Sequence, residues 1–271
     1  MKSSLCFLSI TTMKTGNNSN GVSGESLGID IGGSGIKAAP VDLTTGLLTS
    51  EPCYVAFSGK TSPEETKRII EEIIAKFAWH ETVGIGYPGV VKEGIALSAA
   101  NISPRWLHTN LEKFFQPAVR NKIRVINDAD AAGLAEMKYG SGKERNHPQG
   151  GTVLLLTLGT GIGSALFCHG RLFPNTEFGH VFLGNGLEGE VFAAASVRVR
   201  QQLSWEEWGG RLDYYLKEME KLTSPDLIII GGGIVENFDK FQSFLKTSAP
   251  VRPALMGNHA GIIGAALYAA P

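Results

Sequence analysis

Two glycine-rich turns, each directly after an apolar, strand-like run, constrain this chain more than any other feature. The first is I-D-I-G-G-S-G-I at residues 29–36, and the second is L-T-L-G-T-G-I-G at residues 156–163. A third apolar run ends in three glycines at residues 227–233. A strand that ends in glycines brings bare backbone N–H groups close to a ligand, and such groups favour anions. One such turn could be an ordinary hairpin, but three together favour phosphate binding.

Apolar strand patterns alternate with helical patterns along the chain. Strands are expected at residues 27–31, 39–43, 53–57, 83–87, 122–126, 152–157 and 227–230. Apolar residues at helical spacing predict helices at residues 63–77, 204–222 and 260–269. The apolar stripe of the second helix is expected to be either core or a subunit contact. This alternation predicts an α/β fold, and the two equivalent glycine turns predict two similar domains.

Charge and cysteine content exclude several classes of function. The 271 residues carry 25 basic and 26 acidic side chains, so no overall field favours nucleic acid or a membrane surface. No apolar run approaches the ~18 residues of a membrane span. The three cysteines are far apart, which disfavours a disulfide framework or a zinc cluster and fits a reducing cytoplasm. The polar residues 1–26 are predicted to be a disordered tail.

Carboxylates stand beside two of the predicted strand ends. Asp30 alternates out of its strand toward the first glycine turn, where it could hold Mg²⁺ directly or through water, since Mg²⁺ takes few protein ligands. Asn127 and Asp128 follow another strand and can be read as a helix N-cap or as a carboxylate placed for chemistry. Neither the Rossmann pattern nor the Walker pattern surrounds the turns.

Five motifs, which occur in the family's order, resemble the ROK group of sugar kinases and repressors. They are D-I-G-G-S-G-I-K (30–37), N-D-A-D-A-A-G-L-A-E (127–136), L-G-T-G-I-G-S-A (158–165), N-T-E-F-G-H (175–180) and I-I-I-G-G-G (228–233). The resemblance extends from about Leu27 to the C-terminus. It implies the two-domain actin/hexokinase-like (ribonuclease H-like) α/β fold with a cleft between the domains. The N-terminal domain would span residues 27–126 and the C-terminal domain 127–257, with a last helix at 258–270 packed back on the first.

Within this group the residues are most similar to the polyphosphate glucokinases, which phosphorylate the 6-hydroxyl of glucose with inorganic polyphosphate. The stretch at 183–196 contains no cysteine, whereas ordinary ROK kinases carry a cysteine-rich zinc motif there, so no zinc is expected. A ROK repressor would carry a winged helix before the first glycine turn, and the 26 residues expected to precede the folded part are too few for one, so a repressor is not expected. The resemblance implies a cytoplasmic, Mg²⁺-dependent homodimer. The alternatives are a strictly ATP-dependent hexose kinase and, from another class, a non-catalytic actin-like nucleotide-binding protein; ATP as a second donor also stays open.

The resemblance also implies roles for individual residues. Asp128 would be the catalytic base, and the sugar would contact Asn101, Asn127, Glu177, His180 and Glu190, with Glu188 as a competitor for the last position. The donor phosphates would be held by Gly32, Gly33, Ser34, Gly35, Lys37, Thr160, Gly161, Gly231, Gly232 and Gly233, and Mg²⁺ by Asp30.

Without the resemblance, the readings of several residues are plainer. Glu177 and His180 could belong to a capped loop, or could be two ligands of a metal whose third ligand is not evident. Asp130 is most simply a first-turn acid that favours the helix dipole.

Overall fold

The computed structural model describes residues 24–57, 61–99, 102–116 and 122–270. Two five-stranded sheets share one topology, with strand orders β3-β2-β1-β4-β7 and β10-β9-β8-β11-β12. The first sheet contains β1 (Glu25–Ile31), β2 (Gly35–Asp42), β3 (Cys53–Ala56), β4 (Val83–Tyr87) and β7 (Ile123–Asn127). The second sheet contains β8 (Thr152–Leu158), β9 (Ile162–Cys168), β10 (Arg171–Phe173), β11 (Leu227–Gly231) and β12 (Val251–Pro253). In both sheets three antiparallel strands adjoin two parallel ones.

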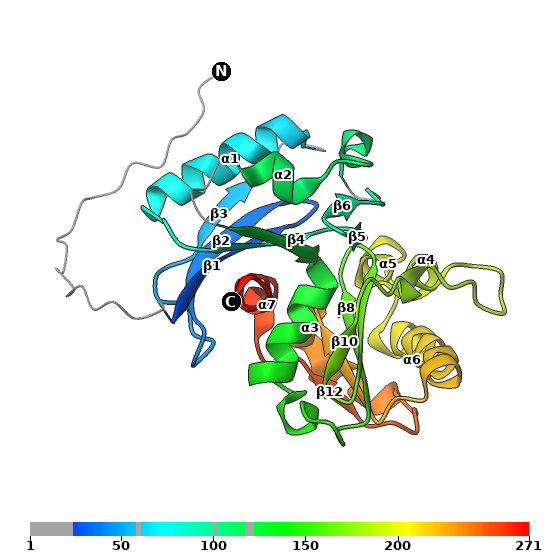
Figure 1. Cartoon of the computed structure of the whole chain (residues 1–271). Coiled ribbons are helices and arrows are strands. Elements are labelled where there is room, and N and C mark those ends of the chain that lie inside the picture. Colours follow the sequence, from blue (N-terminus) through cyan, green and yellow to red (C-terminus); the bar gives the residue numbers. More distant parts are fainter. Residues whose placement is uncertain (1–23, 58–60, 100–101, 117–121, 271) are drawn as a thin grey trace.

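Helices cover the outer faces of the sheets and fill the space between them (Figure 1). The α-helices are α1 (Pro63–Lys76), α2 (Leu111–Phe115), α3 (Asp128–Tyr139), α4 (Gly189–Ala193), α5 (Ala195–Arg200), α6 (Trp205–Thr223) and α7 (Ala260–Ala269). Short 3₁₀ helices occur at Pro104–Trp106, Lys143–Arg145, Phe178–His180, Gly233–Lys240, Gln242–Phe244 and Gly257–His259. A small hairpin, β5 (Val91–Lys92) and β6 (Ile95–Ala96), follows β4. Among the described residues, no helix combines the length and apolar character needed to cross a bilayer.

The long outer helices begin where their capping residues predict. The Ser62 hydroxyl accepts a hydrogen bond from the Glu65 amide before α1. At α6, Ser204 and Glu207 form a reciprocal capping box. The apolar stripe of α6 packs into the core of the second half, where Trp208 and Leu212 are fully buried. Of the two readings of this stripe, core packing is the one that the structure bears out.

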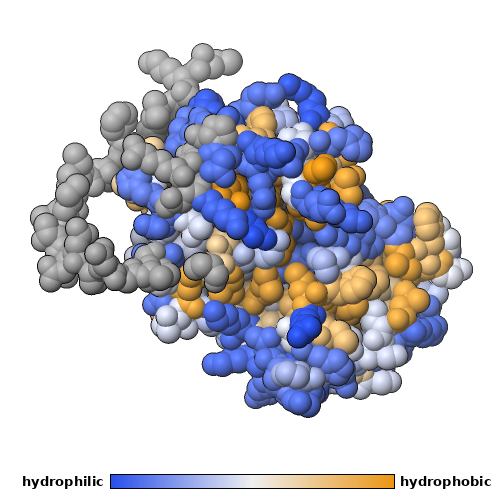
Figure 2. All heavy atoms as spheres, viewed as in Figure 1, coloured by the Kyte–Doolittle hydropathy of each residue, from blue (hydrophilic) through white to orange (hydrophobic). Residues whose placement is uncertain are grey.

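Helices α3 and α7 cross each other between the two sheets, with α7 against β1 and β4 and α3 against β9. Figure 2 shows hydrophobic residues in the middle of a largely polar face, where these helices lie. Glycines make the close contact: a Cβ at Gly28, Gly84 or Gly264 would overlap a backbone carbonyl oxygen of Ile262, Ala265 or Ala131, respectively. The two halves therefore meet through backbone contacts that admit no larger side chain.

Two strands begin more than one residue before their predicted starts. β1 begins at Glu25, two residues before the expected start of the folded part, and pairs there with Asp42. β2 begins at Gly35 rather than at residue 39, because the first glycine turn is a tight hairpin. Residues 1–23 lie outside the described part of the chain.

Candidate active site

The first two glycine turns are equivalent β-hairpin loops. The first joins β1 to β2, and the Gly32 amide donates to the Gly35 carbonyl at 2.8 Å. The second joins β8 to β9, and the Gly159 amide donates to the Gly161 carbonyl at 3.0 Å. The hairpin reading of these turns is therefore correct as geometry. It does not exclude ligand binding, because both loops open onto one pocket.

This pocket, of about 430 Å³, is built from both halves of the molecule. From the first half come Gly33, Ser34, Pro88, Gly89, Asn127 and Asp128. From the second half come Thr157, Leu158, Gly159, Thr160, Gly161, Ile162, Gly163, Glu177, Glu190 and Gly232. A larger hollow of about 860 Å³ lies along α6 and is lined by none of the predicted site residues. The smaller pocket therefore brings the glycine turns and the carboxylates together.

The start of α3 places one carboxylate in this pocket. Asn127 is the N-cap, and its Oδ1 accepts from the Asp130 amide at 2.9 Å. The Asn127 Nδ2 donates to the Gly89 carbonyl at 3.1 Å, so the same side chain fixes the pocket wall after β4. Asp128 is the first residue of the helix, and its Oδ1 accepts from the Ala129 amide at 2.8 Å. Capping fixes the helix start, and the helix start fixes Asp128.

The environment of Asp128 favours its neutral form. Burial raises the pKa of the Asp128 carboxyl to about 7, and the nearby Asp30 adds to the rise. Burial also raises the pKa of Asp30, while the positive charge of Lys37 opposes that rise. Asp30 and Lys37 lie directly opposite each other on β1 and β2. Of these residues Asp128 lines the pocket, whereas Asp30 and Lys37 lie behind its lining, at the ends of β1 and β2 that flank the first glycine turn.

This arrangement fits a hard divalent cation. Carboxylate oxygens are the ligands that Mg²⁺ prefers. Burial raises the pKa values of Asp30 and Asp128, and the Asp30 charge adds to the rise at Asp128, so a bound cation would stabilise the charged forms of both carboxyls. The Asp30 carboxylate also lies against Gly261 at the start of α7, where an added Cβ would come within 2.6 Å of its Cγ. A larger residue at position 261 would displace the Asp30 carboxylate.

Glu177 precedes a short 3₁₀ helix, Phe178–His180, as its N-cap, and His180 is the last residue of that helix. Their side chains approach to 3.8 Å between His180 Nε2 and Glu177 Oε2. His180 Nδ1 bonds to Glu188 Oε2 at 2.9 Å, and this bond raises the pKa of the imidazole. Glu177 lines the pocket, whereas the half-exposed His180 lies at its rim.

The two competing glutamates occupy different places. Glu190 lines the pocket, and its Oε2 accepts from the Ile162 amide at 3.3 Å. A Cβ at Gly161 would collide with this carboxylate, so the second turn needs glycine there. Glu188 instead holds His180. His180, Glu188 and Glu190 together could also hold a metal ion.

The remaining predicted residues divide into those near the pocket and those away from it. Gly32, Gly231 and Gly233 belong to the same turns without lining it, and Gly233 lines a neighbouring hollow of about 290 Å³. Gly35 is needed for packing, because a Cβ there would lie 2.6 Å from the Val55 carbonyl oxygen. Asn101 lies outside the described residues.

Sequence reasoning missed the wall formed by Pro88 and Gly89. A signal existed, since this Pro-Gly pair ends an apolar strand just as the glycine turns do. It also underrated Asp130, which is fully buried and accepts from the Asn175 amide at 2.7 Å. Asp130 does lie in the first turn of α3, as predicted, and its burial and its bond to Asn175 are features that the sequence pattern did not indicate.

Comparison with known proteins identifies the family. The ROK family profile matches residues 26–191. The chain belongs to the ROK family. The polyphosphate glucokinase of Mycobacterium tuberculosis is 43% identical over 241 residues, which cover 89% of each chain. That of Mycobacterium leprae is 40% identical over 89% of this chain and 73% of its own length.

Solved structures of ROK proteins share the architecture. The inorganic polyphosphate/ATP-glucomannokinase from Arthrobacter sp. strain KM superposes with a TM-score of 0.84 at 40% identity, covering 91% of this chain and 98% of its own. A ROK glucokinase from Streptomyces griseus, solved with glucose and AMPPNP, gives a TM-score of 0.74 at 25% identity, covering 91% and 99%. The fold is therefore the actin/hexokinase-like fold that the five ROK motifs predict.

Proposed function

We propose that this ROK protein transfers a phosphoryl group from inorganic polyphosphate to the 6-hydroxyl of glucose, giving glucose 6-phosphate. The observation that carries the proposal is that both glycine turns and Asp128 line the same pocket. Its relatives of 40–43% identity are named polyphosphate glucokinases. The residues of the acceptor side argue against an actin-like protein that only binds nucleotide, because such a protein needs no carboxylates for a sugar.

Asp128 is the proposed general base. A base works best when its pKa lies near the working pH, and the Asp128 pKa of about 7 meets that condition. Phosphoryl transfer passes through a loose transition state, so the base acts mainly by orienting the hydroxyl and taking its proton late. The position of Asp128 at the first residue of α3 gives it the fixed geometry that this task needs.

The sugar would lie between the start of α3 and the loop that carries Glu177. Asn127 already uses its amide for the helix cap and for Gly89, which leaves one N–H and one lone pair for a hydroxyl. Glu177 and Glu190 offer carboxylates inside the pocket, and His180 offers an imidazole at the rim, held by Glu188. The role proposed for Asn101 rests on the family resemblance alone.

The donor would lie along the glycine turns. Backbone N–H groups around Gly33, Ser34, Thr160, Gly161 and Gly232 line the same pocket and are suited to phosphate oxygens. Asp30 would hold Mg²⁺, and that ion, when bound, would neutralise charge on the transferred phosphate. Lys37 adds positive charge beside Asp30.

The proposal extends to the whole protein. We take residues 27–126, with the helix at 258–270, and residues 127–257 as two domains that close over glucose. We also propose a cytoplasmic homodimer that uses ATP as a second donor. The polyphosphate/ATP-glucomannokinase similarity supports the second donor.

A coupled assay tests the function. Purified protein with Mg²⁺ is given glucose and either polyphosphate or ATP, and NADPH formed by added glucose-6-phosphate dehydrogenase is followed. We expect turnover with polyphosphate. Turnover with ATP alone would make the protein an ATP-dependent hexose kinase, and no hexose-dependent turnover with either donor would refute the enzyme. Mannose is then tested in place of glucose, and phosphoryl transfer to it is measured as consumption of the donor. This measurement shows whether the acceptor site also takes a second hexose.

A further inference from the structure

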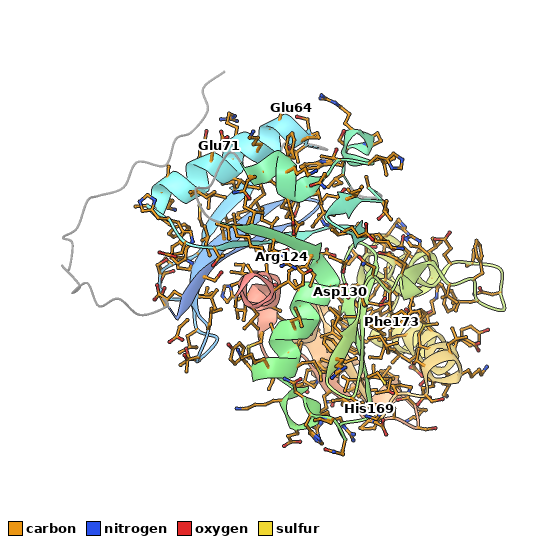
Figure 3. The ribbon with its side chains drawn as sticks, in the orientation of Figure 1. Glu64, Glu71, Arg124, Asp130, His169 and Phe173 are labelled. Atoms are coloured by element: carbon orange, nitrogen blue, oxygen red, sulfur yellow. The ribbon has the colours of Figure 1, made fainter. Side chains whose placement is uncertain are left out.

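Asp130 is a buried carboxyl for which the proposed chemistry has no direct use. It is fully buried on the first turn of α3, where the two halves meet (Figure 3). Burial raises its pKa to about 7, against the hydrogen bond that Oδ2 accepts from the Asn175 amide. Its Oδ1 is buried without a partner among the described residues. A carboxyl in such a place is unfavourable for folding, so a compensating role is to be sought in its partner.

That partner, Asn175, ties two distant segments together. Its Oδ1 accepts from the Val91 amide at 2.8 Å, and its Nδ2 donates to the Val91 carbonyl at 2.9 Å. Both backbone groups of a β5 residue are thus satisfied by one side chain from the loop after β10. Asn175 has φ 60°, a left-handed conformation that asparagine tolerates better than most residues.

The bridge Asp130–Asn175–Val91 joins segments that each carry a pocket wall. Asn175 is two residues before Glu177, which lines the pocket. Val91 is two residues after Gly89, which lines the opposite part and accepts from Asn127. Asp130 is two residues after Asp128. The bridge therefore links the acceptor-side residues of three separate chain segments.

The other end of the Glu177 loop is held independently. The Ser164 hydroxyl donates to the Thr176 carbonyl at 2.8 Å and accepts from the Phe178 amide at 3.1 Å. These bonds attach the loop to β9, within the second sheet. Among the hydrogen bonds of the described residues, those of the bridge join this loop directly to α3 and to β5, in addition to the packing of β9 on α3. The bridge therefore helps to set the distance between Glu177 and Asp128.

We infer that Asp130 and Asn175 are positioning residues that set the Glu177 loop and the Gly89 wall against Asp128, and so determine affinity for the sugar acceptor. The inference rests on the proposed function. Neither residue touches the reacting atoms. Their loss should weaken ground-state binding of the sugar and leave the donor side, which lies along the glycine turns, unchanged.

The test compares variants in steady-state kinetics with polyphosphate as the donor. Asn175→Gly keeps the left-handed backbone conformation and removes the side-chain amide that bonds to Val91. Asp130→Ala removes the carboxylate that accepts from the backbone N–H of Asn175. For both we expect a rise of about tenfold in the KM for glucose, the size expected from losing one or two buried hydrogen bonds. Turnover should stay within about threefold, and the KM for polyphosphate should not change, because uniform binding of the acceptor is what is lost.

Two control variants separate positioning from general destabilisation. Asp130→Asn keeps an oxygen that can accept from Asn175 N–H, so its KM for glucose should stay within about twofold of wild type. Ser141→Ala removes the 2.6 Å bond of the Ser141 hydroxyl to the Pro253 carbonyl, and neither residue lines the pocket. It should lower the melting temperature without changing either KM.

Each outcome decides something. A glucose KM unchanged in folded Asn175→Gly or Asp130→Ala protein overturns the inference. If turnover falls, both KM values rise by similar factors and the melting temperature is lower, the role of the residue is merely structural. That result overturns the inference as well. If Asn175→Gly does not fold, the contrast between the two Asp130 variants decides. A wild type without hexose-dependent turnover refutes the proposed function first, and the inference with it.

Discussion

The two halves of this protein share a sheet but differ in the helix that follows the last strand. In the first half, β7 runs directly into α3, which begins with the Asn127 cap and Asp128. In the second, β12 is followed by Gly257–His259 and then by α7, A-G-I-I-G-A-A-L-Y-A, which has no charged residue and is almost wholly buried. One topological position thus carries the chemistry in one half and the packing between halves in the other.

The helices are also exchanged between the sheets. α7, which follows the second sheet, packs on β1 and β4 of the first, and α3 packs on β9 of the second. Any movement of one half therefore moves a helix that begins in the other. Asp128 lies in the first turn of α3. Its position therefore depends on how α3 packs against both halves of the molecule.

The largest expected effect comes from removing the carboxylate of Asp128 at the start of α3, which has no counterpart at the start of α7. Asp128→Asn should lower turnover by about 10²–10⁴, the usual contribution of a general base, while the Asn127 cap keeps α3 folded. His259→Asn, at the equivalent start of α7, should leave turnover unchanged, since His259 is exposed and away from the pocket. Near-normal turnover of a folded Asp128→Asn protein would show that the base is elsewhere.

The next effect concerns packing. Gly264→Ala puts a Cβ onto the Ala131 carbonyl oxygen, in the first turns of α3. We expect a loss of about 1–3 kcal/mol in unfolding free energy from overpacking, with lower turnover because α3 shifts. Both are measured by urea unfolding and the coupled assay.

Gly210→Ala is the matched control for that substitution. Gly210 lies on the exposed face of α6, where a Cβ would meet nothing within 4 Å. There alanine should stabilise by about 1 kcal/mol through helix propensity and leave turnover unchanged. If both variants behaved alike, the crossing of α3 and α7 would not be close-packed.

The sequence predicted all five strands of the first sheet, but of the second sheet only β8 and β11. Apolar strands, helix periods and the three glycine turns depend on local pattern, and α1, α6 and α7 lie within one or two residues of their predicted ranges. The ROK motifs added the fold and the candidate site. The pocket residues are close to one another because parallel strands end at one edge of each sheet, which is a property of topology that the strand pattern already implies.

What the sequence could not supply are contacts between distant segments. The Asn175–Val91 pairing joins residues 84 positions apart, and nothing in either segment signals the other. The sequence favoured Glu190 with Glu188 as a competitor, and the fold separates the two, since Glu188 bonds to His180 and Glu190 to the Ile162 amide. The contact of Asp130 with the Asn175 amide likewise joins segments that are far apart in the sequence.

The smallest effect is a pH-dependent difference in stability between the two helix starts. Because the folded-state pKa of Asp128 is about 7 and the unfolded value is about 3.9, ionising Asp128 destabilises the native state progressively as the pH rises from about 4 to above 7. Without Mg²⁺ or substrates, Asp128→Asn should therefore melt higher than wild type at pH 8, by about 2–4 °C for each kcal/mol relieved. The difference should vanish near pH 4, where both proteins are neutral at this position. His259→Asn should show no gain at pH 8 over pH 7, and an equal melting temperature of Asp128→Asn and wild type at pH 8 would mean that Asp128 is solvated like an ordinary surface carboxylate.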